Sequence, residues 1–334
     1  MTEAELEELL SRPTPRVIEV LRRLPGDLLI LGAGGKMGPT LAMMARRALR
    51  PDRQVIAVSR FSDQAARQCL DAAGITTIAA DLLDRSALAG LPDAANLVFM
   101  AGQKFGTDSA PHVTWAMNAG VPALVVDRFP GARTVVFSSG NVYPLTHARS
   151  PGPTEDHPVA PVGEYAMSCL ARERIFEHAA ATRGTPVALM RLNYAVDLRY
   201  GVLVDTAVRV RDRVPVPLTM GQVNVIWQGD ANARALQCLD LAATPMTILN
   251  VTGPENVSIR WLAERFGERF GVTPAFEGHE AADALLSNAA RSIGVLGPLT
   301  VSLDQMIDWT VQWLETGGRL LGQATKFEVR DGRF

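Results

Sequence analysis

The segment from Leu28 to Arg50 constrains the fold of this chain more than any other. Its first four residues, Leu28 to Leu31, are all apolar and predict a strand buried on both faces, as in a parallel sheet. A glycine-rich turn follows, and beyond it apolar residues recur at helical spacing as far as Ala48. A strand, a turn and a helix in this order present main-chain N–H groups and the positive end of a helix dipole to an anion. The segment therefore predicts a binding site for a nucleotide phosphate.

The spacing of the glycines narrows the kind of turn. The fingerprint G-x-G-x-x-G would require glycine at position 37, where the chain has Met37. The pattern G-x-x-G-x-x-G fits through Gly32, Gly35 and Gly38. Glycine turns also serve ordinary strand-to-helix connections, but the buried strand before this one and the helix after it favour a cofactor site. We expect the three glycines, Lys36 and Met37 to contact the cofactor.

Composition and charge exclude several classes of protein. The chain has 334 residues, of which 47% are apolar, so we expect one large α/β unit or two smaller domains with a sizeable core. A net charge of −2 gives no electrostatic reason to expect nucleic acid or an anionic membrane as a partner. The first residues are acidic, unlike a signal peptide, and no apolar run reaches the roughly 18 residues that span a bilayer. Three widely spaced cysteines and scattered histidines predict no disulfide framework and no metal site. We therefore expect a cytoplasmic protein.

Apolar strands alternate with helical patterns from Leu28 onward. The expected strands are Leu28–Leu31, Val55–Val58, Ile75–Ala79, Asn96–Met100, Thr134–Ser138 and Pro186–Met190. The helices expected between and beyond them cover 63–73, 111–126, 162–182, 201–213, 259–270 and 303–316. This alternation predicts a doubly wound parallel sheet with helices on both faces and ligands at the carboxyl ends of its strands. After Arg191 short strands, at 223–227 and 246–251, and proline-containing loops predict a smaller C-terminal α/β lobe.

The chain is expected to fall into three parts. They are a helical extension over 1–26, a nucleotide-binding domain over 27–192, and a mainly substrate-binding lobe over 193–334 whose segments near 223–240 and 246–252 return to the nucleotide-binding domain. We expect the extension to cap the edge of the sheet. The polar tail over 325–334 is either an added edge strand or a frayed end.

The residues after the second strand bear on the choice between NAD and NADP. This strand ends in Ser59 and Arg60, and no acidic residue follows before Asp63. A carboxylate here normally binds the adenosine ribose of NAD, whereas an arginine accommodates the 2′-phosphate of NADP. Most arginines in loops are merely solvated, but the position of Ser59 and Arg60 predicts cofactor contact, with NADP preferred and NAD as the alternative. Asp81 ends the third strand, where its carboxylate either accepts from the adenine amino group or caps the next helix. After the fourth strand, Ala101 and Gly102 lie at the same expected edge.

The chain resembles an extended short-chain dehydrogenase/reductase, of the group often called the NAD-dependent epimerase/dehydratase family. The similarity covers most of residues 28 to 315, more loosely after about 195. It rests on Gly32-x-x-Gly35-x-x-Gly38, on Ala80-Asp81-Leu82, on Ser138-Ser139-x-x-Val142-Tyr143 and on Tyr165 in the following helix. The resemblance implies a Rossmann-type fold, and adenine contacts from Asp81 and Leu82. It also implies a homodimer that packs through the helices expected at 111–126 and 162–182.

The resemblance also implies a reaction. In this family a tyrosine hydroxyl passes a proton to or from a substrate hydroxyl or carbonyl while the nicotinamide exchanges a hydride. Tyr165 stands at the place of that tyrosine, and Ser139 at the place of the serine that fixes the substrate oxygen. Asn141 and Asn193 are the candidate substrate contacts, although the segment from Arg191 to Asn193 is one residue short of the family's spacing. The implied substrate is a sugar-like or sugar-nucleotide metabolite.

One departure from the family's pattern affects the chemistry directly. A lysine normally follows the tyrosine by four residues and lowers its pKa, but this chain has Cys169 there. Without the lysine we expect the pKa of Tyr165 to stay near its reference value of about 10, which makes it a poorer base at neutral pH.

Three interpretations of this site remain open. Lys104, just beyond the fourth strand, replaces the missing cation, or it is an ordinary solvated lysine. Alternatively, another group donates the proton, or none is needed because the substrate is already acidic; in this interpretation Cys169 is a buried filler or, as the alternative, a nucleophile. In the third interpretation the protein binds a dinucleotide without turnover, as a regulatory or scaffold protein. Ser139 and Tyr165 together favour an enzyme.

Overall fold

A computed structural model describes residues 1–333 of the chain, and a sheet of seven parallel strands forms its centre. The strand order is β12-β7-β5-β4-β1-β2-β3, and every neighbouring pair is parallel. The strands are β1 Leu28–Leu31, β2 Val55–Ser59, β3 Thr76–Ala79, β4 Asn96–Phe99, β5 Arg133–Ser139, β7 Val187–Leu192 and β12 Thr247–Val251. The doubly wound parallel sheet predicted from the sequence is confirmed.

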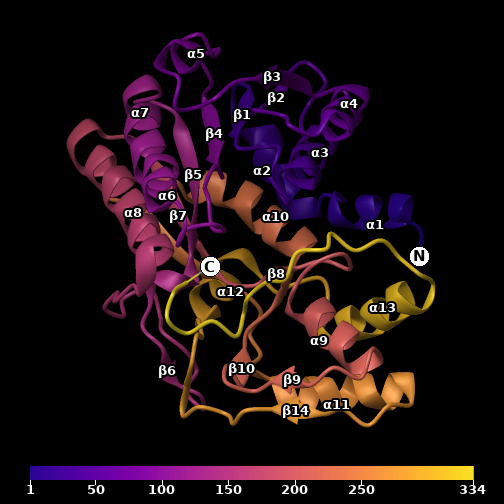
Figure 1. Ribbon diagram of the computed structural model, residues 1–334. Helices are drawn as coiled ribbons and strands as arrows, with labels where there is room; N and C mark the ends of the chain where they lie inside the picture. Colours follow the sequence, from indigo (N-terminus) through magenta and orange to yellow (C-terminus); the bar gives the residue numbers. More distant parts are fainter. Residues whose placement is uncertain (334) are drawn as a thin grey trace.

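Helices cover both faces of this sheet (Figure 1). One face carries α3 Gly38–Ala48, α4 Gln64–Ala72 and α10 Gln228–Cys238, and the other carries α5 Arg85–Ala89, α6 Pro111–Trp115, α7 Val121–Arg128 and α8 Gly163–Arg183. Successive residues of β1 supply the two cores in turn, since side chains alternate across a strand. Leu28 and Ile30 lie in the core shared with α3 and α10, whereas Leu29 and Leu31 lie in the core shared with α7 and α8. This double burial explains the unbroken apolar run of the strand.

The strand order places a topological switch point between β1 and β4. From β1 the chain proceeds through β2 and β3 toward one edge, and from β4 through β5, β7 and β12 toward the other. Loops leaving β1 and β4 at their carboxyl ends therefore diverge to opposite faces and leave a crevice between them. Gly32 and Met100 follow directly after these two strands.

The N-terminal extension forms two helices, α1 Glu3–Leu10 and α2 Pro15–Arg23, but its expected position at the sheet edge is wrong. The helix α2 packs on α10 and α3, over one face of the sheet. The side chains of Leu6 and Leu10 in α1 are fully buried in the core of the C-terminal lobe. Apolar residues on opposite sides of the Thr14–Pro15 break thus reach two different cores, a division that the sequence pattern does not reveal.

The C-terminal lobe is built around a third core beneath the sheet (Figure 1). Its helices are α9 Val202–Arg211, α11 Ile259–Phe270, α12 Ala290–Leu296 and α13 Leu303–Glu315. The short strands of this part are β6 Thr146–His147, β8 Ala195–Val196, β9 Val216–Pro217, β10 Gln222–Val223, β11 Ile226–Trp227, β13 Val257–Ser258, β14 Phe276–Glu277 and β15 Asp283–Ala284. The single strand expected over 223–227 is wrong, because β10 pairs with β13 whereas β11 pairs with β8.

The C-terminal tail forms neither the added edge strand nor the frayed end that were expected. Up to residue 333 it contains no strand, and it crosses between the lobes as an extended strap (Figure 1). Its main-chain N–H and hydroxyl at Thr325 both donate to Asp205 of α9, at 2.8 and 2.6 Å, and Phe327 is buried in the core of the C-terminal lobe. Arg330 forms an ion pair with Asp283. Phe334, the last residue of the expected tail, lies outside the described residues.

The helix expected over 111–126 is interrupted by a π-helical turn, Ala116–Gly120, between α6 and α7. This turn packs against α8 and places Asn118 in the interior. Among residues 1–333, none of the helices combines the length and apolar character needed to cross a membrane.

Candidate functional site

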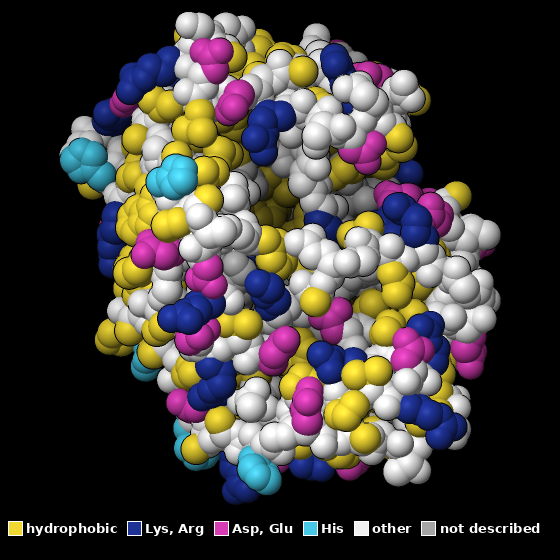
Figure 2. Space-filling view, viewed as in Figure 1, with side chains coloured by type: hydrophobic (Ala, Val, Ile, Leu, Met, Phe, Trp, Pro, Cys, Tyr) yellow, Lys and Arg dark blue, Asp and Glu magenta, His cyan; other side chains and the backbone are white. Residues whose placement is uncertain are grey.

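Two cavities lie side by side along the carboxyl ends of the strands. The first, of about 230 Å³, lies over β2 and β3, and the second, of about 290 Å³, lies between the sheet and the C-terminal lobe. Both are lined by Gly32, Gly35 and Met100, so they form one groove that passes over the switch point. Figure 2 shows the molecule hollowed near the centre of one face. We call these the adenosine-side cavity and the inner cavity.

The glycine turn fits closely between its neighbours. Gly32 has φ of +95°, and a Cβ there would lie 2.5 Å from the main-chain nitrogen of Ala101. A Cβ on Gly38 would overlap the carbonyl group of Ala33. Met37 is the N-cap residue of α3 and supplies no side-chain cap, so no capping side chain covers the first turn of the helix. The N–H of Gly38 donates to Gly35 and Pro39 has none, so an anion in the groove would meet the N–H groups of Lys36 and Met37.

Ser59 and Arg60 both line the adenosine-side cavity, as expected from their place after β2. The Arg60 side chain is exposed. Asp63, the first acidic residue after β2, accepts hydrogen bonds from the N–H groups of Ala65 and Ala66 as the N-cap of α4. The end of β2 therefore presents a hydroxyl and a guanidinium to the cavity, with its nearest carboxylate used as a helix cap.

The remaining candidates of the adenosine side lie around the same cavity. They are Asp81, Leu82, Ala101 and Gly102. The Asp81 carboxylate accepts from the N–H of Leu83, whereas Asp84 is the N-cap of α5, so the helix-capping alternative for Asp81 is wrong. Gly102 leaves room for a buried guanidinium, because a Cβ there would lie 2.6 Å from Arg172.

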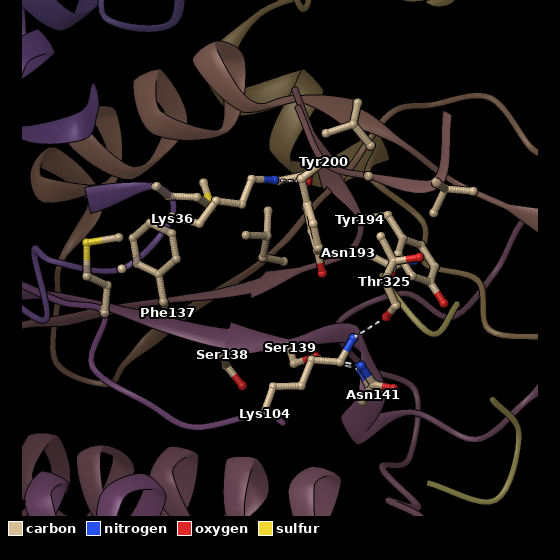
Figure 3. Close-up of a pocket in the computed structure, with 18 of the residues that line it drawn as sticks. Lys36, Lys104, Phe137, Ser138, Ser139, Asn141, Asn193, Tyr194, Tyr200 and Thr325 are labelled. Carbon is tan, nitrogen blue, oxygen red and sulfur yellow. Dashed lines mark hydrogen bonds between the residues drawn. The ribbon is translucent and has the colours of Figure 1, made fainter. Parts of the chain in front are cut away.

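The catalytic candidates of the sequence analysis meet in the inner cavity (Figure 3). Ser139, Asn141, Tyr165, Lys104 and Asn193 all line it, together with Lys36 and Met37 of the glycine turn. Ser139 ends β5 and accepts hydrogen bonds from the main-chain N–H and the side-chain amide of Asn141, at 3.2 and 2.9 Å. Asn141 therefore holds the serine oxygen in place.

The pKa of Tyr165 differs from the sequence expectation. Burial raises it far above the reference value, and the neighbouring Cys169 raises it further, whereas Arg172 and hydrogen bonding with Ser139 lower it. The expectation of a value near 10 was wrong because it allowed for the loss of the lysine but not for desolvation. Cys169 is itself fully buried and burial raises the pKa of its thiol, in agreement with its interpretation as a filler.

Arg172 is a buried cation that the sequence analysis missed. It lies seven residues after Tyr165 on α8 and donates to the Phe137 carbonyl oxygen and to the Asn118 side chain, both at 2.7 Å. Asn118, on the π-helical turn, also donates to Ser168 at 2.9 Å. Helical spacing places Arg172 on the same face of α8 as Tyr165, which was the available signal.

Lys104 points into the inner cavity and not into bulk solvent. Its Nζ donates to the Thr325 carbonyl oxygen of the strap at 3.2 Å, as Figure 3 shows. Burial lowers its pKa from 10.5 to about 8, and Cys169 raises it in part. The ammonium group of Lys104 thus lies near Cys169, the residue that stands at the place of the family's lysine.

Lys36 leaves the glycine turn and crosses toward the C-terminal lobe (Figure 3). Its Nζ donates to the Ala195 carbonyl oxygen at 3.1 Å and lies 4.2 Å from the centre of the Tyr200 ring. Burial lowers its pKa from 10.5 to about 8, an effect that Asp197 opposes. The pKa of Tyr200 is raised to about 12, chiefly by burial, so this ring stays a neutral phenol at physiological pH.

Arg191 and Asn193 face different surroundings although they are two residues apart. The guanidinium of Arg191 lies outside the cavity, pairs with Glu173 of α8 at 2.7 Å, and donates to the Tyr143 hydroxyl at 2.7 Å. Ser138 donates to the same Glu173 at 2.6 Å. Asn193, 2% exposed, lines the inner cavity, and its side-chain nitrogen makes no hydrogen bond with any group among residues 1–333. Arg191 therefore supports the sheet, whereas Asn193 keeps a donor available to a ligand.

Within the described part of the chain, no three or more side chains of His, Cys, Asp or Glu are arranged to hold a metal ion.

Comparison with known proteins gives a family and a set of solved structures. The sequence profile of the NAD dependent epimerase/dehydratase family matches residues 28–196. No curated protein sequence matched the chain.

The similar solved structures share the fold at low sequence identity. A short-chain dehydrogenase/reductase superfamily protein from Agrobacterium tumefaciens with bound NAD is 17% identical, with a TM-score of 0.73 over 87% of this chain and 98% of that one. A UDP-glucose 4-epimerase from Thermotoga maritima with UDP-glucose is 15% identical, and Pal from Bacillus thuringiensis is 19% identical. Both of these have a TM-score of 0.72 over 87% of this chain and 99% of theirs.

Proposed function

The chain belongs to the NAD-dependent epimerase/dehydratase family, and from this premise we propose that it is an NAD(P)-dependent oxidoreductase or epimerase. Its substrate is a sugar-like metabolite that reacts at a hydroxyl or keto carbon. The structures with a similar fold include an epimerase solved with UDP-glucose and a protein solved with NAD, which supports the class of reaction. The carrying observation is the groove over the switch point, which runs from the glycine turn to Ser139 and Tyr165.

The residues of the groove fit a dinucleotide. Gly32 and Gly38 leave space where a Cβ would collide with the main chain, and the start of α3 has no side-chain cap. We place the adenosine end by Asp81 and Leu82, and the pyrophosphate at the turn. Ser59 and Arg60 support NADP as the preferred cofactor, with NAD as the alternative, because both line the adenosine-side cavity and the first carboxylate after β2, that of Asp63, caps α4. Arg60→Ala should then weaken the binding of NADPH more than the binding of NADH in fluorescence titrations. Equal losses of affinity for the two would contradict the preference for NADP.

The chemistry of the inner cavity follows from its hydroxyl groups. A bound nicotinamide supplies or accepts the hydride at the substrate carbon. Ser139, fixed by Asn141, donates a hydrogen bond to the substrate oxygen. Tyr165 transfers the proton to or from that oxygen, and its raised pKa keeps it protonated, which favours proton donation to a carbonyl over proton removal from an alcohol.

Lys104 takes over the charge of the missing lysine in this proposal. Its ammonium lies in the inner cavity and interacts electrostatically with Cys169, the residue at the lysine's place. A cation there stabilises the phenolate form of Tyr165 as it gives up its proton. Lys104→Met should therefore lower kcat and shift its pH profile.

A regulatory dinucleotide-binding protein without turnover is the second candidate. Cys169 in the lysine's place and the raised pKa of Tyr165 favour it. The test is to measure Kd for NADH and NADPH, and then hydride transfer to a panel of keto sugars. Oxidation of the cofactor that falls on the order of 100-fold or more in Tyr165→Phe supports the enzyme. Tight binding with no transfer across the panel would leave the regulatory role, and no binding would refute both. A homodimer and a cytoplasmic location stay predictions.

A further inference from the structure

Lysine is rare in this chain, and its few lysines gather at the inner cavity. Of the 33 basic side chains of Lys and Arg, only Lys36, Lys104 and Lys326 are lysines. Lys36 and Lys104 line the inner cavity, and Lys326 is next to the cavity residue Thr325 in the strap. Lysine differs from arginine in presenting a compact charge with three rotatable donors. Arginine thus supplies 30 of the 33 basic side chains, and two of the three lysines line the inner cavity.

The inner cavity carries positive charge and offers many hydrogen-bond donors. Its lining includes Lys36 and Lys104 and, among the described residues, no Asp or Glu, while the carboxylates of Asp197 and Asp205 interact with Lys36 from outside the lining. Both lysines have a pKa of about 8, lowered chiefly by burial, so both are mostly protonated at neutral pH. The unpartnered side-chain nitrogen of Asn193 is a further buried donor in the same lining. The unused donors of Lys36 and Asn193 are costly unless a ligand with matching acceptors occupies the cavity.

Lys36 faces the substrate side of this cavity, although it belongs to the glycine turn. Its two contacts, the Ala195 carbonyl oxygen and the Tyr200 ring, lie beyond the carboxyl end of β7, across the cleft from Gly35. It does not line the adenosine-side cavity. Since an ammonium group has three donors and Ala195 takes one, Lys36 retains capacity for an anion beside Asn193.

The strap limits the size of what can bind. Thr325 forms part of the wall, and its hydrogen bonds with Lys104 and Asp205 join the two lobes across it. On the far side of the strap, a separate cavity of about 230 Å³ lies between α9 and residues 320–328. The inner cavity, at about 290 Å³, is near the lower end of the ~300–1,000 Å³ range for small-molecule sites. A nicotinamide ring must share it, so the enclosed space left beside the strap suits a compact molecule.

We propose that the substrate is a compact hydroxy or keto carboxylate of sugar-like character, with no nucleotide attached, whose carboxylate is bound by Lys36 and Asn193. This inference rests on the proposed function for the reacting carbon, and it adds the charge and the size of the substrate. The carboxylate meets donors at the Lys36 end of the cavity, while Ser139 and Tyr165 take the reacting oxygen.

The test compares ligands that differ in charge or size. Full-length protein is titrated calorimetrically, with and without saturating NADPH or NADH, with D-glucuronate, D-galacturonate and D-gluconate. The neutral counterparts are D-glucose, D-galactose and D-glucitol, and the enlarged ligand is UDP-glucuronate. A charged hydrogen bond to a buried ammonium should make at least one free acid bind about 10- to 100-fold more tightly than its neutral counterpart. UDP-glucuronate should bind more weakly than the free acid.

Variants assign the preference to Lys36. In Lys36→Met the ratio of acid to neutral affinity should fall to about one, whereas the matched Lys326→Met, whose side chain does not line the cavity, should keep the wild-type ratio. Overturning results are an unchanged ratio in Lys36→Met, equal affinity for acids and neutral sugars, tighter binding of UDP-glucuronate, or no binding of any free acid. If the acids bind preferentially but neither dinucleotide binds, the anion site stands and the proposed function fails.

Discussion

Replacing Lys36 with methionine is expected to stabilise the protein at neutral pH, and the gain should disappear in alkali. Burial lowers the pKa of Lys36 from 10.5 to about 8. Since one pKa unit corresponds to about 1.4 kcal/mol, keeping this ammonium charged in the folded protein costs up to about 3 kcal/mol below pH 8. Methionine is similar in length and carries no charge, so the variant avoids this cost.

The sign of the pH dependence follows from proton binding. Between pH 8 and 10.5 the Lys36 amine is mostly protonated in the unfolded chain and mostly neutral in the folded protein. Unfolding then takes up a proton, so the free energy of unfolding of the wild type rises with pH across this window. The variant lacks this contribution. Its advantage should fall from about 3 kcal/mol at pH 7 toward zero near pH 10.5.

Urea unfolding at pH 7, 8, 9 and 10, followed by tryptophan fluorescence, measures this difference directly. Lys36→Gln is the control, because it also removes the charge but packs differently. It should show the same pH dependence, displaced by a constant. A wild type more stable than Lys36→Met at pH 7, or a difference that does not change with pH, would refute the reasoning that burial strains this ammonium.

Three further substitutions test other parts of the structure. Arg191→Met should cost about 3–5 kcal/mol in urea unfolding because it leaves Glu173 buried without its partner; a loss below 1 kcal/mol would contradict this. Gly38→Ala should weaken the binding of NADPH and of NADH alike and lower Tm, since the new Cβ would overlap the Ala33 carbonyl group. Unchanged affinities for both dinucleotides would contradict the role given to this glycine. Phe327→Ala should cost about 3–5 kcal/mol and speed tryptic cleavage in the strap, whereas a wild-type cleavage rate would show that Phe327 does not anchor it.

The sheet and the elements of the site were predictable because their signals are local. Each of the strands β1, β2 and β4 is a short apolar run of its own, and the residues that follow it reach the cleft by topology alone. Ser139 and Tyr165 were identified from the family resemblance, and both line the inner cavity.

Electrostatics and long-range contacts were not predictable from the same patterns. The pKa of Tyr165 depends on how completely neighbouring segments exclude water, which residue spacing does not report. Arg191 lies near the end of β7, and the next two residues line the inner cavity. Its own side chain points away from the cavity because it pairs with the buried carboxylate of Glu173. The strap has no periodicity, and its bond from Lys104 to Thr325 joins residues 221 positions apart.

The scarcity of lysine gives this protein an unusual chemical handle. Only three ε-amines exist in the chain, and the two in the inner cavity have a pKa of about 8. An amine at its pKa is half deprotonated and therefore nucleophilic, so a small electrophile such as cyanate at pH 8 will carbamylate few positions, each of which the masses of the peptides after digestion identify. The extent of modification at Lys36 and Lys104 then measures how far a ligand occupies the inner cavity.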